Sequence, residues 1–115
     1  MIVDDNPLMR AMIRNFVAGP SDDVSECEDG VAVVSAFRQT NPDVVLMDLQ
    51  MLKVGGIEAT RRLKEEFPNA NVIIVSNFRE QEFKDEAKEA GAIAYFTKDD
   101  LIQLKQFIHK TLAQQ

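Results

Sequence analysis

The chain has a single cysteine, fewer basic than acidic residues and no long apolar run. Because Cys27 is alone among 115 residues, no disulfide or multi-cysteine metal site can form within the chain. Lys and Arg number 13 against 19 Asp and Glu, and this net charge of −6 disfavours binding to a nucleic-acid backbone as the main task. No signal peptide or bilayer-spanning run is recognisable, so we expect a soluble cytoplasmic protein.

Short apolar runs alternate with segments of helical period along the whole chain. This alternation predicts an α/β fold in which helices cover both faces of a parallel sheet. The length suits one domain over residues 1–115 with a single core. We expect five helices and five strands, the strands at residues 2–3, 24–27, 44–47, 72–75 and 93–97. The first strand is short enough to suggest a trimmed N-terminus.

The expected helices carry start and stop signals. Asn6 is expected to cap the first helix, with Pro7 at its first position. The inner stripe predicted for this helix consists of Met9, Met12, Ile13, Phe16 and Val17. Further caps are predicted at Asp29, at Asp99 or Asp100, and at Gly91, which follows a charged helix over residues 79–90.

Acidic side chains follow two of the predicted strands. Asp4 and Asp5 follow the first strand, and Asp48 follows the third. Ligands of open parallel sheets bind outside the carboxyl ends of the strands, so we expect these acids in one crevice with Ser76 and Lys98. Neighbouring carboxylates raise one another's pKa, and hard divalent cations prefer carboxylate oxygens. The sequence therefore predicts a Mg2+ pocket that contains a reactive aspartate.

Four separated motifs resemble the signature of the response-regulator receiver domain of two-component signalling. The motifs are Ile2-Val3-Asp4-Asp5, residues 43–51 followed by Gly56, Ser76, and Tyr95-Phe96-Thr97-Lys98, in the order and spacing of the family. The opening residues 4–8 and Asp99 are similar to receivers of LuxR/NarL-type DNA-binding regulators. The resemblance implies a doubly wound, flavodoxin-like (CheY-like) sheet of five parallel strands in the order 2-1-3-4-5.

The resemblance also implies a chemical role for each residue of the crevice. Asp48 would accept a phosphoryl group from a sensor histidine kinase or a phosphotransfer protein. Lys98 and Ser76 would contact the phosphoryl oxygens. The implied ligands of Mg2+ or Mn2+ are Asp5, Asp48, the main-chain carbonyl of Gln50 and, through a water, Asp4.

A conformational switch is implied as well. It would couple Ser76 to the ring of Tyr95, which turns from exposed to buried on activation, and would change a face formed by the last two helices and the last strand. Activated copies would pair there. Gln50, Asn77 and Phe78 would tune the lifetime of the phosphoryl group. Asn77 departs from the family pattern, which has Ala or Gly at that position.

Two other functions remain open at this stage. A pseudo-receiver would be a protein-interaction module independent of phosphorylation, and Asn77 is compatible with it. A Mg2+-dependent aspartyl-phosphate hydrolase of the haloacid dehalogenase type needs an acid two residues after the nucleophile, where this chain has Gln50. A DNA-binding output domain would lie outside these residues.

Overall fold

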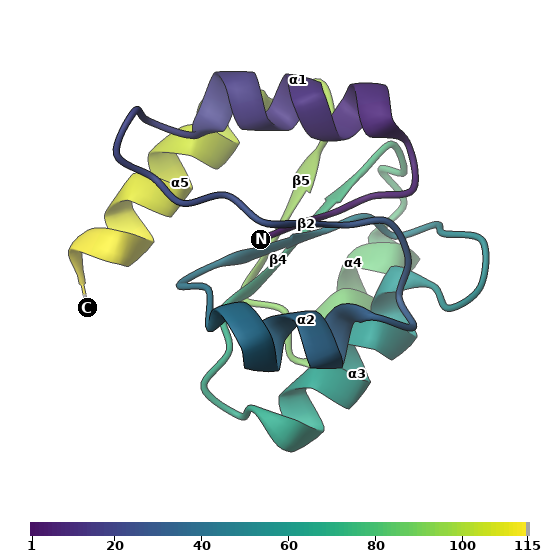
Figure 1. Ribbon diagram of the computed structural model, residues 1–115. Helices are drawn as coiled ribbons and strands as arrows, with labels where there is room; N and C mark the ends of the chain where they lie inside the picture. Colours follow the sequence, from purple (N-terminus) through teal and green to yellow (C-terminus); the bar gives the residue numbers. More distant parts are fainter. Residues whose placement is uncertain (115) are drawn as a thin grey trace.

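A five-stranded parallel sheet lies between two layers of helices in the computed structural model, which describes residues 1–114 (Figure 1). In chain order the elements are β1 (Ile2–Val3), α1 (Pro7–Val17), β2 (Glu26–Cys27), α2 (Val33–Thr40), β3 (Val45–Met47), α3 (Gly56–Glu66), β4 (Val72–Ser76), α4 (Gln81–Ala90), β5 (Ala94–Thr97) and α5 (Leu101–Ala113). Helices α1 and α5 cover one face of the sheet, and α2, α3 and α4 cover the other.

The strand order is β2-β1-β3-β4-β5, as predicted. The chain leaves β1 toward β2 at one edge and then returns to place β3 on the other side of β1. Val3 of β1 is in register with Met47 of β3. The order therefore reverses between the two strands that precede Asp4 and Asp48, and this is the position at which open α/β sheets bind ligands.

Successive residues of the central strands enter two separate hydrophobic clusters. Val72 and Ile74 of β4 pack with Leu63 of α3, whereas Ile73 and Val75 pack on the opposite face, where α1 and α5 lie. Side chains alternate between the two faces of a strand, so strands covered on both faces read as continuous apolar runs. This burial holds the sheet, and with it the strand ends, in place.

The predicted cap of α1 is confirmed, but the predicted inner stripe is partly wrong. Ile13 and Val17 are buried, whereas Met12 is 54% exposed and Phe16 is 40% exposed. Each exposed residue precedes a buried one and is therefore rotated from it by about 100° around the helix axis. The Lys105 amine of α5 lies 5.9 Å from the centre of the Phe16 ring. Since α5 covers the rest of this face, only a narrow stripe of α1 reaches the sheet.

Two other predicted caps differ from expectation. Asp29 Oδ1 accepts hydrogen bonds from the Val31 and Ala32 amides, but α2 begins only at Val33, so Asp29 stabilises the preceding turn. Asp100 precedes α5 without a capping hydrogen bond from its side chain. Gly91 does end α4, in the left-handed conformation at φ 109°. This conformation carries no steric penalty for glycine.

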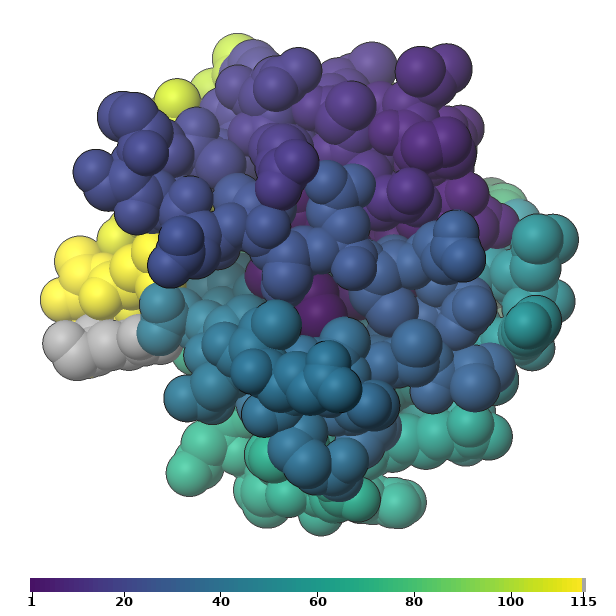
Figure 2. Space-filling view, in the orientation of Figure 1, coloured from purple at the N-terminus to yellow at the C-terminus, as the bar shows by residue number. Residues whose placement is uncertain are grey.

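A hollow of about 720 Å³ lies at the amino ends of the strands. It is lined in part by Met1, Ser25 and Val44, which begin or precede β1, β2 and β3. Figure 2 shows atoms of the start of the chain, in dark purple, in a gap between the segment around β2 and helix α2. None of the helices within residues 1–114 combines the length and apolar character needed to cross a membrane.

Candidate metal centre

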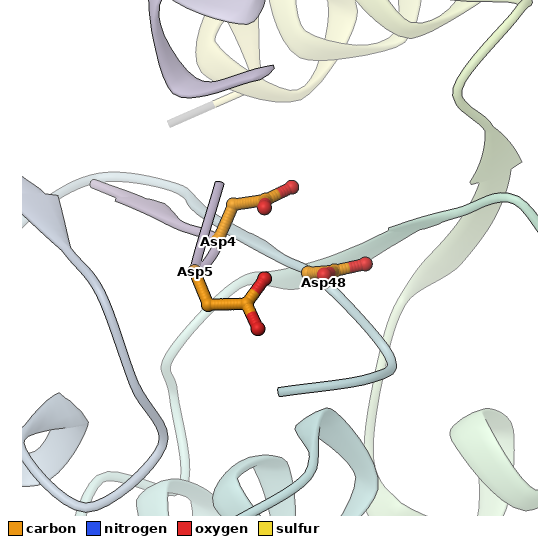
Figure 3. Close-up of side chains that lie close together, drawn as sticks. All are labelled: Asp4, Asp5 and Asp48. Carbon is orange, nitrogen blue, oxygen red and sulfur yellow. The ribbon is translucent and has the colours of Figure 1, made fainter. Parts of the chain in front are cut away.

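Three carboxylates meet at the carboxyl ends of β1 and β3. One oxygen from each of Asp4, Asp5 and Asp48 lies within 4.8 Å of the others. Figure 3 shows the three side chains projecting to the same side of the strand ends. Asp4 and Asp48 are buried and Asp5 is half-buried. The structure therefore brings together the three acids that the sequence predicted to share a crevice.

Main-chain contacts hold the ends of β1 and β3, and with them these acids, side by side. The Asp48 amide donates to the Val3 carbonyl over 2.8 Å, so pairing between β1 and β3 continues to the acidic residue itself. Gly56 then lets α3 begin close to this strand end. A Cβ at Gly56 would lie 2.0 Å from the Asp48 main-chain oxygen, closer than any side chain can approach. Residue 56 is therefore restricted to glycine by the path of the backbone around Asp48.

Lys98 bridges two of the carboxylates. Its amine lies 3.0 Å from Asp4 Oδ2 and 3.1 Å from Asp48 Oδ1, and its side chain is only 12% exposed. The Lys98 amide donates to the Ser76 carbonyl over 2.9 Å, which fixes the end of β5 beside β4. Burial lowers the pKa of the Lys98 amine, but the contacts with Asp4 and Asp48 outweigh burial and raise it. Lys98 therefore carries its positive charge inside the cluster.

Asp48 is held in an unfavourable charge state when no cation is bound. Burial and the neighbouring Asp4 charge raise its pKa to about 6, although Lys98 and the Leu49 amide act in the opposite direction. Asp4 Oδ2 is buried and receives no well-directed hydrogen bond within residues 1–114. One lysine faces three acids, so negative charge remains in excess. An all-oxygen donor set of this kind fits a hard divalent cation.

Ser76 and Tyr95 are both linked to the peptide groups of Phe78. Ser76 Oγ accepts the Phe78 amide hydrogen over 3.0 Å, and the Tyr95 hydroxyl donates to the Phe78 carbonyl over 2.8 Å. The Tyr95 ring is half-buried against the core, and this burial raises the pKa of its phenol. The Phe78 ring contacts Phe83 of α4, with ring centres 5.0 Å apart. A main-chain link of this kind has no signal in the sequence, because any residue at position 78 supplies it.

The remaining predicted residues lie on the outer side of the strand ends. Gln50 and Asn77, which follow β3 and β4 respectively, are both exposed. Leu52, in the loop between β3 and α3, is 89% exposed. Gln50 and Leu52 follow Asp48 closely in the sequence, and Asn77 follows Ser76 directly. The side chains of all three residues are accessible to solvent or to a bound partner.

Comparison with known proteins identifies the family. The sequence pattern of the response regulator receiver domain matches residues 1–109. The transcriptional regulatory protein YxjL of Bacillus subtilis is 36% identical over 102 residues, covering 87% of this chain and 47% of that protein. Chemotaxis protein CheY of Halobacterium salinarum is 35% identical over 98 residues, covering 85% of this chain and 82% of that protein.

A solved structure agrees with this match. A LuxR-family two-component response regulator from Aurantimonas sp. SI85-9A1 is 36% identical, with a TM-score of 0.91 over 100% of this chain and 84% of its own. The chain spans about half the length of the first curated relatives, 47% and 52%. The matches favour neither the pseudo-receiver nor the hydrolase. With this strand order, this acidic cluster and these relatives, the chain belongs to the response regulator receiver domain family.

Proposed function

We propose that this chain is a phosphoacceptor switch that receives a phosphoryl group on Asp48 from a sensor histidine kinase or a phosphotransfer protein. The observation that carries the proposal is the cluster of three carboxylates within 4.8 Å, bridged by Lys98. Residues 1–115 would act as one receiver domain in the cytoplasm. The reactions are limited to phosphorylation and dephosphorylation of the chain itself.

The carboxylates would hold Mg2+ or Mn2+. Bound there, the ion offsets the charge of the acids and of the transferring oxygens. The proposed ligands are Asp5, Asp48, the main-chain carbonyl of Gln50 and, through a water, Asp4. The donor chemistry on this edge of the sheet supports the assignment, because hard cations select carboxylate and carbonyl oxygen.

Asp48 supplies the nucleophile. One carboxylate oxygen forms the new bond to phosphorus while the bond from phosphorus to the donor histidine nitrogen breaks, and the electron pair leaves with that nitrogen. Lys98 lies 3.1 Å from Asp48 and would donate to a phosphoryl oxygen in a charge-assisted contact. The Ser76 hydroxyl would donate to another. Gln50, Asn77 and Phe78 would border this space and set how readily water reaches the acyl phosphate.

The response would be a population shift between two conformers. If the Ser76 hydroxyl turned to the phosphoryl group, it would lose the hydrogen bond that it accepts from the Phe78 amide. Because the Phe78 carbonyl accepts the hydrogen bond of the Tyr95 hydroxyl, a shift of residue 78 would also release Tyr95. Phosphoryl contacts available in one conformer only would bias the equilibrium. The affected face consists of α4, β5 and α5, where two activated copies would pair. A DNA-binding output domain outside these residues would read the change, as the transcriptional relatives suggest.

Intact-mass spectrometry after incubation with acetyl phosphate tests the proposal. We expect a single phosphoryl adduct that requires Mg2+ and is absent from Asp48→Asn. Asp23→Asn, which removes an exposed acid remote from the cluster, should form the adduct as the wild type does. No adduct on a folded wild-type chain would refute the proposal and favour the pseudo-receiver.

The proposed pairing has its own test. Gel filtration with and without beryllofluoride, an acyl-phosphate mimic, should show earlier elution only in the presence of the mimic. Unchanged elution of a chain that forms the adduct would exclude pairing through this face while leaving the phosphoacceptor function intact.

A further inference from the structure

We infer that Arg10 is a positioning residue of the carboxylate cluster: its guanidinium fixes the peptide between Asp4 and Asp5 and so sets where the Asp5 carboxylate lies for a cation. The inference rests on the proposed cation site. It concerns a side chain on α1 that lies outside the four family motifs and that provides none of the proposed ligands.

The contact joins Arg10 to the main chain of the cluster. Arg10 Nη1 donates to the Asp4 carbonyl oxygen over 2.6 Å. The Asp4 amide, on the other side of the same residue, donates to the Cys27 carbonyl of β2 over 3.1 Å. The sheet bonds the peptide between Val3 and Asp4 at both its carbonyl and its amide, and strand β1 ends at Val3. The bond from Arg10 restrains the following peptide, between Asp4 and Asp5.

The carboxylate of Glu26 holds the Arg10 guanidinium in place. Arg10 Nε donates to Glu26 Oε1 over 2.8 Å, and the other oxygen of Glu26 contacts Arg14 Nη1 at 3.0 Å. The Arg10 side chain is only 15% exposed. The rigid guanidinium of arginine can bond a carboxylate through one nitrogen and a carbonyl through another, whereas lysine has only one nitrogen and cannot span both groups in this way. The geometry therefore requires arginine at position 10.

Asp4 and Asp5 depend on this bond to different degrees. Asp4 has further restraints, because its Oδ1 accepts the Asn6 amide over 2.9 Å and its Oδ2 faces Lys98. Asp5 is half-buried, and its side chain follows directly after the peptide that Arg10 restrains (Figure 3). Loss of the Arg10 bond should therefore displace Asp5 more than Asp4.

Charge alone predicts the opposite effect on cation binding. Removing a positive side chain beside an acidic pocket should strengthen binding of a cation, because one repulsion disappears. Loss of a positioning contact should weaken it, since groups that orient metal ligands commonly contribute 10-fold or more to affinity. The direction of the change therefore separates the two roles.

Mn2+ binding to the full chain, followed by electron paramagnetic resonance of the free ion, measures this direction. We expect Arg10→Met to bind Mn2+ about 10-fold more weakly than the wild type. Arg14→Met is the matched control, because it removes an arginine from the same Glu26 but leaves the Asp4 carbonyl bonded. It should bind within about twofold of the wild type, since a surface ion pair contributes little. Arg10→Lys keeps the charge and should also bind weakly.

Unchanged or tighter binding by Arg10→Met, or equal weakening by Arg14→Met, would overturn the inference. The Asp5 amide shift in NMR spectra of the metal-free chain gives an independent reading. It should move in Arg10→Met and Arg10→Lys but not in Arg14→Met. If the wild type binds no Mn2+, the proposed cation site fails, and an Asp5 amide unmoved by Arg10→Lys would overturn the positioning role as well. Arg10→Lys also serves if Arg10→Met does not fold.

Discussion

Replacing Asp48 by Asn should stabilise the metal-free protein at neutral pH. Asp48 is 7% exposed, and burial together with the Asp4 charge raises the pKa of its carboxyl from 3.8 to about 6. At about 1.4 kcal/mol for each pKa unit, the ionised group costs at most about 3 kcal/mol of folding free energy at pH 7. The substitution would also remove the ionic contact with Lys98. We therefore expect Asp48→Asn to raise the free energy of unfolding by about 1–3 kcal/mol.

The sign of the pH dependence follows from the raised pKa. Between pH 3.8 and about 6 the folded protein binds more protons at Asp48 than the unfolded chain does, so this group lowers stability as pH rises through that window. Below about pH 3 the carboxyl is protonated in both states. The difference between wild type and Asp48→Asn should therefore be largest above about pH 6 and disappear below about pH 3.

Urea unfolding followed by circular dichroism, in EDTA and then in saturating Mg2+, measures this difference. Mg2+ should stabilise the wild type, because a ligand that binds only the folded state adds to its stability, and should stabilise Asp48→Asn much less. Asp23→Asn, at an exposed acid, should change the unfolding free energy by less than about 0.5 kcal/mol. A mutant less stable than the wild type in EDTA at pH 7, or a difference independent of pH from 4 to 7, would refute the charge-repulsion argument.

Three further predictions concern the same site. Gly56→Ala should lower the free energy of unfolding in urea by about 2–4 kcal/mol, because the added Cβ would meet the Asp48 carbonyl. Gly55→Ala should lower it clearly less, since its Cβ would lie 3.3 Å from the Leu49 oxygen. Equal losses in the two variants would contradict this prediction. Lys98→Met should slow formation of the acetyl-phosphate adduct by about 10-fold or more, as loss of a charge-stabilising donor does, and a wild-type rate in quenched mass spectrometry would exclude its proposed role. At limiting Mg2+ the wild-type adduct rate should rise as pH increases through about 6, since only the ionised Asp48 is a nucleophile, and a rate unchanged from pH 5 to pH 8 would contradict that.

Local chemistry was sufficient for the parts of the fold that depend on chain neighbours. Apolar alternation predicted all five strands and their parallel arrangement, and the resemblance to receivers implied their order. The Asn6 and Gly91 caps were also predictable, because capping needs only a suitable residue within one turn of the helix end. The meeting of Asp4, Asp5 and Asp48 followed from the rule that parallel strands end at one edge.

Tertiary packing decided what the pattern left open. Met12 and Phe16 are apolar and fit the helical spacing, yet both stay exposed, because Ile13 and Val17 occupy the side of α1 that packs into the core. Asp29 does not cap α2 because that helix begins only at Val33, whereas Asp100 stands directly before α5 but its side chain makes no capping hydrogen bond. The bonds of Phe78 to Ser76 and Tyr95 use main-chain groups, which no side-chain pattern reveals.

The sequence by itself determined which chemical groups reach the edge of the sheet, because strand period and strand ends are properties of neighbouring residues. Only the tertiary structure decided how these groups contact one another. Lys98 lies between Asp4 and Asp48 because β5 is held beside β4, and Arg10 reaches the Asp4 carbonyl because α1 packs back over β1. Such contacts depend on the angles and distances between elements, which are set by the packing of the whole core.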